Sequence, residues 1–181
     1  RTTVPGSFEP ISLSAAARRP TGEVGQCVLP PDTPLALEWT VSAGARAYLT
    51  HMRVEGLPEA LEGSGIPNIP DVLTLFGISV SETDTAIVVP TQVGVFERHD
   101  YDNDLMLALN DGFPEGVRVR ITLGAMDRNF VNGIRVDSFH PSGPVRVSSV
   151  HGDGAGVFGS FVPYAFEIEV RSGDGVGCLE E

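Results

Sequence analysis

The chain has 181 residues, 41% of them hydrophobic and 20% charged, which is the composition of a globular protein that can bury a core. Its 12 basic residues are all arginines, and 24 carboxylates give a formal net charge of −12. This charge disfavours binding to nucleic acid or anionic lipid and favours basic or cationic partners. The apolar runs are far shorter than the about 20 residues of a transmembrane helix, so we expect no membrane span.

The first 30 residues are rich in Pro, Ser, Thr and Gly, and they predict an extended N-terminal arm or an added edge strand. Residues 31–181 are then expected to form a single domain. Phe8, Ile11 and Leu13 provide apolar side chains with which the arm could add a strand to a neighbouring protein. We therefore include these three residues among the candidate interaction residues.

Alternating apolar and polar residues predict strands along most of the remaining chain. The clearest example lies at residues 116–127, where Val119 and Ile121 are expected to face the core and Arg118 and Arg120 the solvent. Other strands are expected at 35–41, 47–54, within 71–90, at 105–110, 133–139, 143–150 and 161–170. Residues 56–70 are expected to form a long loop. Many short strands with Gly and Pro between them predict an all-β fold, an antiparallel β-sandwich.

Two stretches resemble fibronectin type III-like, or immunoglobulin-like, domains. Residues 37–54 resemble that family's paired strands, in which a Trp is followed by a Tyr on the next strand, here Trp39 and Tyr48. Residues 107–129 are similar to a later segment with a Leu, a Pro-x-Gly turn and a terminal Ala-x-Asp, here ending at Ala125 and Asp127. The chain departs from the family at Val119, where a corner Tyr is common. The resemblance implies a sandwich of the kind found in exported bacterial surface proteins and lipoproteins.

The two cysteines, Cys27 and Cys178, show neither a metal-binding spacing nor a CxxC motif. In an oxidising compartment they could pair and close a loop of about 150 residues, and the alternative is two free thiols. The sequence starts at Arg1, which we interpret as the start of a processed protein. These features lead us to expect an exported protein, located in the periplasm or at the cell surface.

The acidic stretch at residues 97–112 places Asp100, Asp102 and Asp104 at alternate positions. An EF-hand loop counted from Asp100 would need Gly at its sixth place, where this chain has Leu105. A looser calcium site remains possible, because three neighbouring carboxylates repel each other unless a cation offsets them. The alternative is a hydrated loop beside Arg98. We therefore expect no cofactor other than possible Ca²⁺.

No motif in the sequence indicates an enzyme. The chain lacks a Gly-x-Ser-x-Gly elbow, and its four histidines lack the spacing of a metal site. Glu167 and Glu169 fit the solvent face of a strand without any catalytic role.

We accordingly expect a non-catalytic structural or interaction protein, a subunit of an extracytoplasmic assembly such as a surface filament or an accessory part of a membrane-associated complex. Its partners would be other protein subunits, through which it could also associate with a membrane surface. Tyr101, Arg128 and Phe130 complete the candidate interaction residues. The alternative is a carbohydrate-binding module, possibly calcium-dependent.

Overall fold

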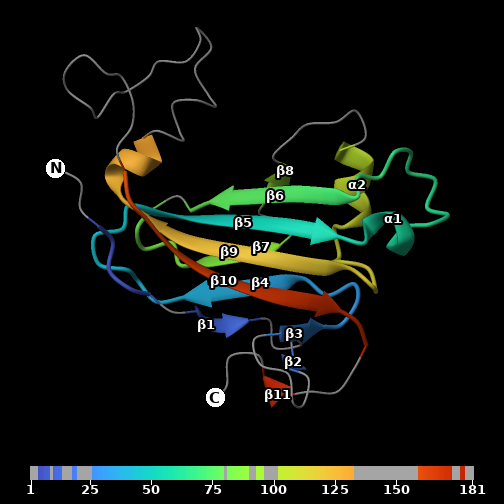
Figure 1. The fold of residues 1–181 in the computed structure, drawn as a ribbon, viewed down its shortest axis with the longest axis horizontal. Helices are drawn as coiled ribbons and strands as arrows, with labels where there is room; N and C mark the ends of the chain where they lie inside the picture. The colour runs from blue at the N-terminus through green and yellow to red at the C-terminus, as the bar shows by residue number, and fades with distance from the viewer. Residues whose placement is uncertain are drawn as a thin grey trace, which may run out of the picture.

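The computed structural model describes residues 4–8, 10–13, 18–19, 26–79, 81–89, 93–95, 102–132, 159–172 and 176–177. Across these residues the protein is predominantly β (Figure 1). No helix among them is long and apolar enough to cross a membrane. The strands within these ranges form two sheets, one of three strands and one of eight.

The three-stranded sheet has the order β1-β4-β7 and is antiparallel. The eight-stranded sheet has the order β11-β2-β3-β10-β9-β5-β6-β8. The strands are β1 Pro10–Leu13, β2 Arg18–Arg19, β3 Gln26–Leu29, β4 Leu35–Trp39, β5 Ala47–Glu55, β6 Val72–Ile78, β7 Ala86–Val89, β8 Gly94–Val95, β9 Arg118–Met126, β10 Phe161–Val170 and β11 Val176–Gly177.

The larger sheet is mixed rather than antiparallel throughout, because β3 pairs with β10 in parallel, with Cys27 opposite Ile168. Antiparallel pairing is imposed where a short turn joins two strands, and parallel pairing needs a longer connection. β3 and β10 come from opposite ends of the chain, so no turn sets their relative direction. The other pairings within this sheet are antiparallel.

One buried cluster draws side chains from both sheets. The small sheet contributes Leu37 and Trp39 on β4, and the large sheet contributes Tyr48, Met52 and other residues on β5, β6, β9 and β10. The rings of Trp39 and Tyr48 meet edge-to-face with centroids 5.3 Å apart. The expected alternation on β9 is confirmed, since Val119 and Ile121 are fully buried while Arg118 and Arg120 are exposed.

The helices are short. α1, Leu57–Ala60, falls within the stretch expected to be a loop, and it begins at Gly56, whose φ of 89° suits glycine. α2, Asp102–Ala108, occupies part of the acidic stretch. Residues 128–132 are also helical and lie at the opposite end of the large sheet from α1 and α2 (Figure 1).

The prediction of a buried strand from Leu105 onward is wrong, because this segment belongs to α2 and the turn after it. Leu105 and Leu109 are both fully buried, whereas Leu107 between them is 75% exposed. Residues four apart share a helix face and residues two apart do not. The exposure of Leu107 therefore matches a helix and contradicts the alternation of a strand.

The N-terminal residues pack against the body of the protein. β1 pairs with β4, and β3 lies within the larger sheet, so strands occur inside the region expected to be an arm. Phe8 is only 6% exposed and meets the ring of Tyr48 edge-to-face at 5.8 Å. The side chain of Phe8 is therefore buried within this chain, and its role in contacts with a partner stays a prediction.

Candidate functional site

The predicted metal residues are only partly described. Asp100 lies outside the described residues, and Asp102 begins α2, so the alternate spacing of Asp102 and Asp104 falls on a helix. Residues two apart on a helix do not share a face. Asp104 is exposed. Among the described residues, no group of three or more His, Cys, Asp or Glu side chains is arranged to hold a metal ion.

The other predicted interaction residues are dispersed. Ile11 and Leu13 belong to β1, and Tyr101 lies outside the described residues. Arg128 is exposed in the helix at 128–132. Phe130, two residues further, is half-buried and stacks on Phe161 with centroids 5.5 Å apart. The structure therefore does not gather the described members of this set, on β1 and in the helix at 128–132, into one site.

Cys27 is buried on β3, and the described part of the chain contains no free cysteine. Cys178 lies outside the described residues, so its pairing with Cys27 stays a prediction.

β10, β9 and β5 run side by side in the large sheet (Figure 1). Charged side chains lie on the outer side of these strands. Alternation turns Met52, Val54 and their neighbours inward and leaves the charged residues between them outward. The register places Arg53 directly opposite Arg120, and Arg120 directly opposite Glu167. In the next row, Arg118 lies between Glu55 and Glu169.

Ion pairs hold two of these three arginines. Arg53 Nε lies 2.7 Å from Glu55 Oε1, and Arg120 Nε lies 2.7 Å from Glu167 Oε1. Arg118 takes part in none of the ion pairs found in the described part of the chain. Like charges directly opposite each other on a sheet are destabilising. The opposed pair Arg53 and Arg120 is thus offset by the neighbouring carboxylates, whereas Arg118 has no such ion pair among the described residues.

A shallow hollow of about 280 Å³ opens among these side chains, lined by Arg53, Glu55, Arg118, Arg120 and Glu167. Three arginines and two carboxylates give the lining a formal charge of +1, in a chain whose net charge is −12. Exposed ion pairs contribute only about 0–1 kcal/mol to stability, so stability alone does not account for this concentration of arginines. We call this surface the arginine face.

A second concave site lies between the two sheets, on the inner side of β5. This cavity of about 220 Å³ is lined by Trp39, Thr50, Ile78, Ser79, Asp84, Ala86 and Ile87. These residues belong to β4, β5, β6, β7 and the connection from β6 to β7. That connection leads from the large sheet to the small one, and it closes one side of the cavity.

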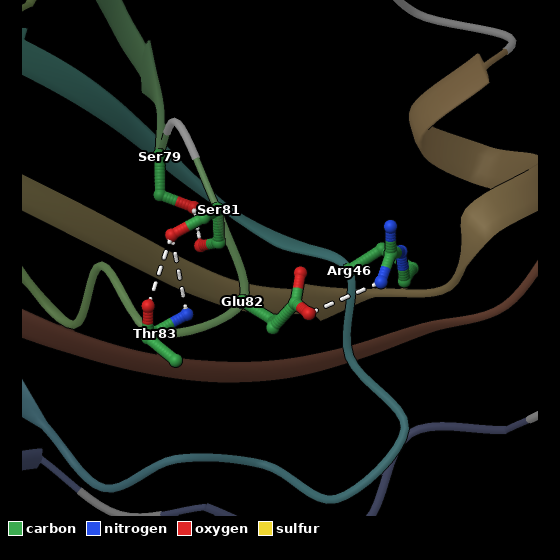
Figure 2. Close-up of polar contacts among 5 residues, drawn as sticks. All are labelled: Arg46, Ser79, Ser81, Glu82 and Thr83. Atoms are coloured by element: carbon green, nitrogen blue, oxygen red, sulfur yellow. Dashed lines mark hydrogen bonds and ion pairs between the residues drawn. The ribbon is translucent and has the colours of Figure 1, made fainter.

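A polar network holds this connection in place (Figure 2). The Ser79 hydroxyl accepts the backbone N–H of Tyr48 at 2.8 Å and donates to the carbonyl of Ser81 at 3.1 Å. The hydroxyls of Ser81 and Thr83 lie 3.1 Å apart. At its outer side, Arg46 pairs with Glu82 at 3.1 Å. The wall of the cavity is therefore tied to Tyr48 on β5 and to Arg46, the residue before β5.

Trp39, one of the residues that line this cavity, has a buried donor without an acceptor. Trp39 is 2% exposed, and its indole Nε1 has no hydrogen-bond partner among the protein atoms. Buried tryptophan N–H groups usually find an acceptor, so this group calls for a physical explanation.

The hydroxyl of Tyr48 makes a hydrogen bond across the turn that precedes β5. It accepts the backbone N–H of Ser42, six residues upstream, at 2.7 Å. The Ser42 hydroxyl in turn donates to the carbonyl of Gly6 at 2.7 Å. Tyr48 thereby connects β5, the preceding turn and the N-terminal segment.

The sequence analysis predicted neither the arginine face nor the cavity. Alternation predicted that Arg118 and Arg120 face solvent, but only the register shows that Arg53 and Glu167 lie beside them. The cavity draws on residues up to 48 positions apart, from Trp39 to Ile87, and its polar members carry no motif. The one signal in the sequence was Trp39, a single Trp on a predicted strand, because the residues two positions away on the same face, Leu37 and Val41, offer its indole N–H no polar partner.

Comparison of the chain with protein-family models, with curated proteins and with solved structures gives no match. The resemblance to fibronectin type III-like domains therefore stays a prediction.

Proposed function

We propose that this chain is a non-catalytic structural or interaction protein, a subunit of an extracytoplasmic assembly at the cell surface or in the periplasm. Its two sheets would form a sandwich of the fibronectin type III or immunoglobulin kind. The shared buried cluster, the edge-to-face pair of Trp39 and Tyr48, and the corner bond from Ser42 to Tyr48 support that assignment. The partners are other protein subunits.

The arginine face is the observation that carries this proposal. It concentrates three of the 12 arginines around one hollow on the exposed side of a rigid sheet. Arginine presents a planar fork of donors that matches a carboxylate, often through two parallel hydrogen bonds. Arg118, which has no ion-pair partner among the described residues, is the first candidate for such a contact.

The chemistry of this face selects an acidic partner surface. A second copy of the chain provides one, because most of its surface charge is negative. Exposed acidic residues such as Glu59, Glu62 and Asp111 lie on a different part of the chain from the arginine face. Contacts between two different faces of identical subunits do not close on themselves unless they form a ring, and otherwise they produce filaments.

The test is the assembly state of the full chain, measured by light scattering at low and high ionic strength. At an ionic strength of 0.1 M the screening length is about 10 Å, so contacts between exposed charges weaken as salt is added. We expect larger particles at low salt and their loss at high salt. Arg118→Gln should reduce assembly at low salt.

Arg46→Gln is the matched control, because it removes the same charge from an exposed side chain at the other end of β5. It should leave assembly unchanged. A monomer under all salt conditions, or equal effects of the two substitutions, would contradict the proposal.

Carbohydrate binding is the second candidate function, and one observation favours it. Tyr164 on β10 is 38% exposed, and its ring lies 6.2 Å from that of Phe166. An exposed aromatic ring can pack against the apolar face of a sugar. Binding to immobilised glycans with and without calcium, compared between the wild type and Tyr164→Ala, tests this function. Equal binding by both proteins would exclude Tyr164 as the platform.

A further inference from the structure

The first half of β10 forms an open edge of the large sheet. β3 pairs only with residues 167–170 of β10, and in the described part of the chain no strand lies beside residues 161–166 on that side. Three consecutive residues there, Pro163, Tyr164 and Ala165, are exposed. We infer that Pro163 prevents a second copy of the chain from pairing with this open edge. This role is independent of the assembly proposed above.

The open edge has the character of a strand that pairs readily. Unpaired backbone groups along a sheet edge are a template for another strand, and proteins limit such pairing with very short edge strands, charged side chains or proline. The strands at the two ends of the large sheet, β8 and β11, have two residues each. The open edge, FVPYAF, has six residues, three of them aromatic and none charged. Of these limiting features, it therefore has only the proline.

The backbone hydrogen bonds of β10 determine the direction in which Pro163 points. At one end, the carbonyl of Ser160 accepts the N–H of Asp127 at 3.1 Å. At the other end, the N–H of Val170 donates to the carbonyl of Val117 at 2.8 Å. The register with β9 is continuous between these ends. Alternate residues of an antiparallel strand bond to the same neighbour, so the even-numbered residues of β10 bond to β9.

The odd-numbered residues point to the opposite side. Arg171 agrees with this direction on the paired half, because its N–H donates to the carbonyl of Leu29 on β3 at 3.0 Å. On the open edge, Phe161 and Ala165 therefore direct both their N–H and C=O groups away from β9. Pro163 lies between them and has no N–H, and its ring occupies the space where that hydrogen would lie. A proline here costs β10 no hydrogen bond to β9, which fits its restriction to sheet edges.

A two-fold axis makes this edge complementary to itself. Two antiparallel β10 strands centred on residue 163 would place Phe161 of each copy opposite Ala165 of the other, and Val162 opposite Tyr164. With an N–H at residue 163, three facing pairs would exchange two hydrogen bonds each, about six in all. Pairs of β-branched and aromatic side chains such as Val162 and Tyr164 also stabilise a sheet.

Pro163 blocks this pairing at its centre. A carbonyl of the second copy would have to approach the nitrogen of Pro163 to about 2.9 Å, and it meets the proline ring instead. The two strands are then held too far apart for Phe161 and Ala165 to bond to the second copy on either side. The protein thereby keeps an uncharged strand at its surface without pairing through it.

The test is Pro163→Val, with the mass of the full chain measured by light scattering over a series of concentrations at high salt. High salt screens contacts between exposed charges, so assembly through the arginine face does not contribute. Valine restores the missing N–H and favours a strand. We expect the wild type to stay monomeric and Pro163→Val to approach twice its mass. In the dimer, the amide hydrogens of Phe161 and Ala165 should become protected from exchange.

Two further variants connect the dimer to the open edge. Pro163→Val combined with Ala165→Pro moves the proline by two residues on the same side of β10, so this double variant should be monomeric again. Pro67→Val is the matched control, because Pro67 is exposed in the turn between α1 and β6. It should remain monomeric like the wild type.

Urea unfolding followed through Trp39 checks that each variant is folded, and Pro163→Ala, a smaller change, replaces Pro163→Val if the latter does not fold. A folded variant that stays monomeric at every concentration would overturn the inference, and so would a dimeric wild type at high salt. A dimer that persists in the double variant, or one formed equally by Pro67→Val, would show that the chains pair through another surface. None of these results depends on whether the arginine face assembles at low salt.

Discussion

Tyr48→Phe should destabilise the fold by removing one oxygen atom. The Tyr48 hydroxyl accepts the Ser42 N–H at 2.7 Å, and the two residues are 1% and 2% exposed. Without the hydroxyl, a buried backbone N–H loses its acceptor, which costs about 1–3 kcal/mol. For a protein of this size, a loss of about 2 kcal/mol corresponds to a fall in Tm of about 4–8 °C.

Urea unfolding followed through Trp39 measures this cost directly, because the Trp39 ring contacts Tyr48. Tyr164→Phe is the matched control, since it removes the same atom from a residue that is 38% exposed. We expect the control to change the free energy of unfolding by less than about 0.5 kcal/mol. If Tyr48→Phe were no less stable than Tyr164→Phe, the buried hydrogen bond would not contribute as argued.

Three other changes test separate features of the structure. Gly112→Ala should cost more than about 2 kcal/mol, because a Cβ there would lie 2.3 Å from the backbone nitrogen of Thr33. The control Gly116→Ala, also at positive φ but in open space, should cost less. Equal denaturation midpoints for the two variants would contradict this prediction. Asp127→Ala should cost about 1–2 kcal/mol in thermal unfolding, because buried Asp127 accepts the Phe130 N–H at 2.8 Å. The control Asp71→Ala, at an exposed position outside the helices, should be neutral. Reduction should lower the free energy of unfolding by up to about 5 kcal/mol if Cys27 pairs with Cys178, and alkylation of both thiols without reductant, seen by mass spectrometry, would refute that pairing.

The strands of the core were the most predictable part of the fold. β4, β5, β9 and β10 each fall within or close to a range that alternation predicted. Burial on one face of a sheet leaves a period of two in the sequence, so the pattern is local and readable. The parallel pairing of β3 with β10 is a long-range choice, and no local pattern specifies it.

α2 shows where local patterns are ambiguous. Leu105, Leu107 and Leu109 alternate as in a strand, while Leu105 and Leu109 also have the spacing of a helix face. The flanking residues carried the deciding signal, since acidic residues precede the helix and Gly112 follows it at a φ of 143°. Reading this segment as a strand also affected the metal prediction, because that prediction placed the carboxylates in a loop before the strand, whereas Asp102 and Asp104 belong to α2.

β5 contributes to both the arginine face and the inner side of the sheet, and it does so with different residues, so substitutions can test the two sides separately. Its even-numbered residues from Tyr48 to Val54 face inward and contact the core or the cavity, while His51 and Arg53 face solvent. Successive side chains on a strand point to opposite faces, so one strand serves two surfaces without sharing side chains. Arg118→Gln should therefore change assembly without changing the free energy of unfolding by more than about 0.5 kcal/mol, and Tyr48→Phe should do the reverse. Coupled effects of either substitution would show that the two faces of β5 do not act independently.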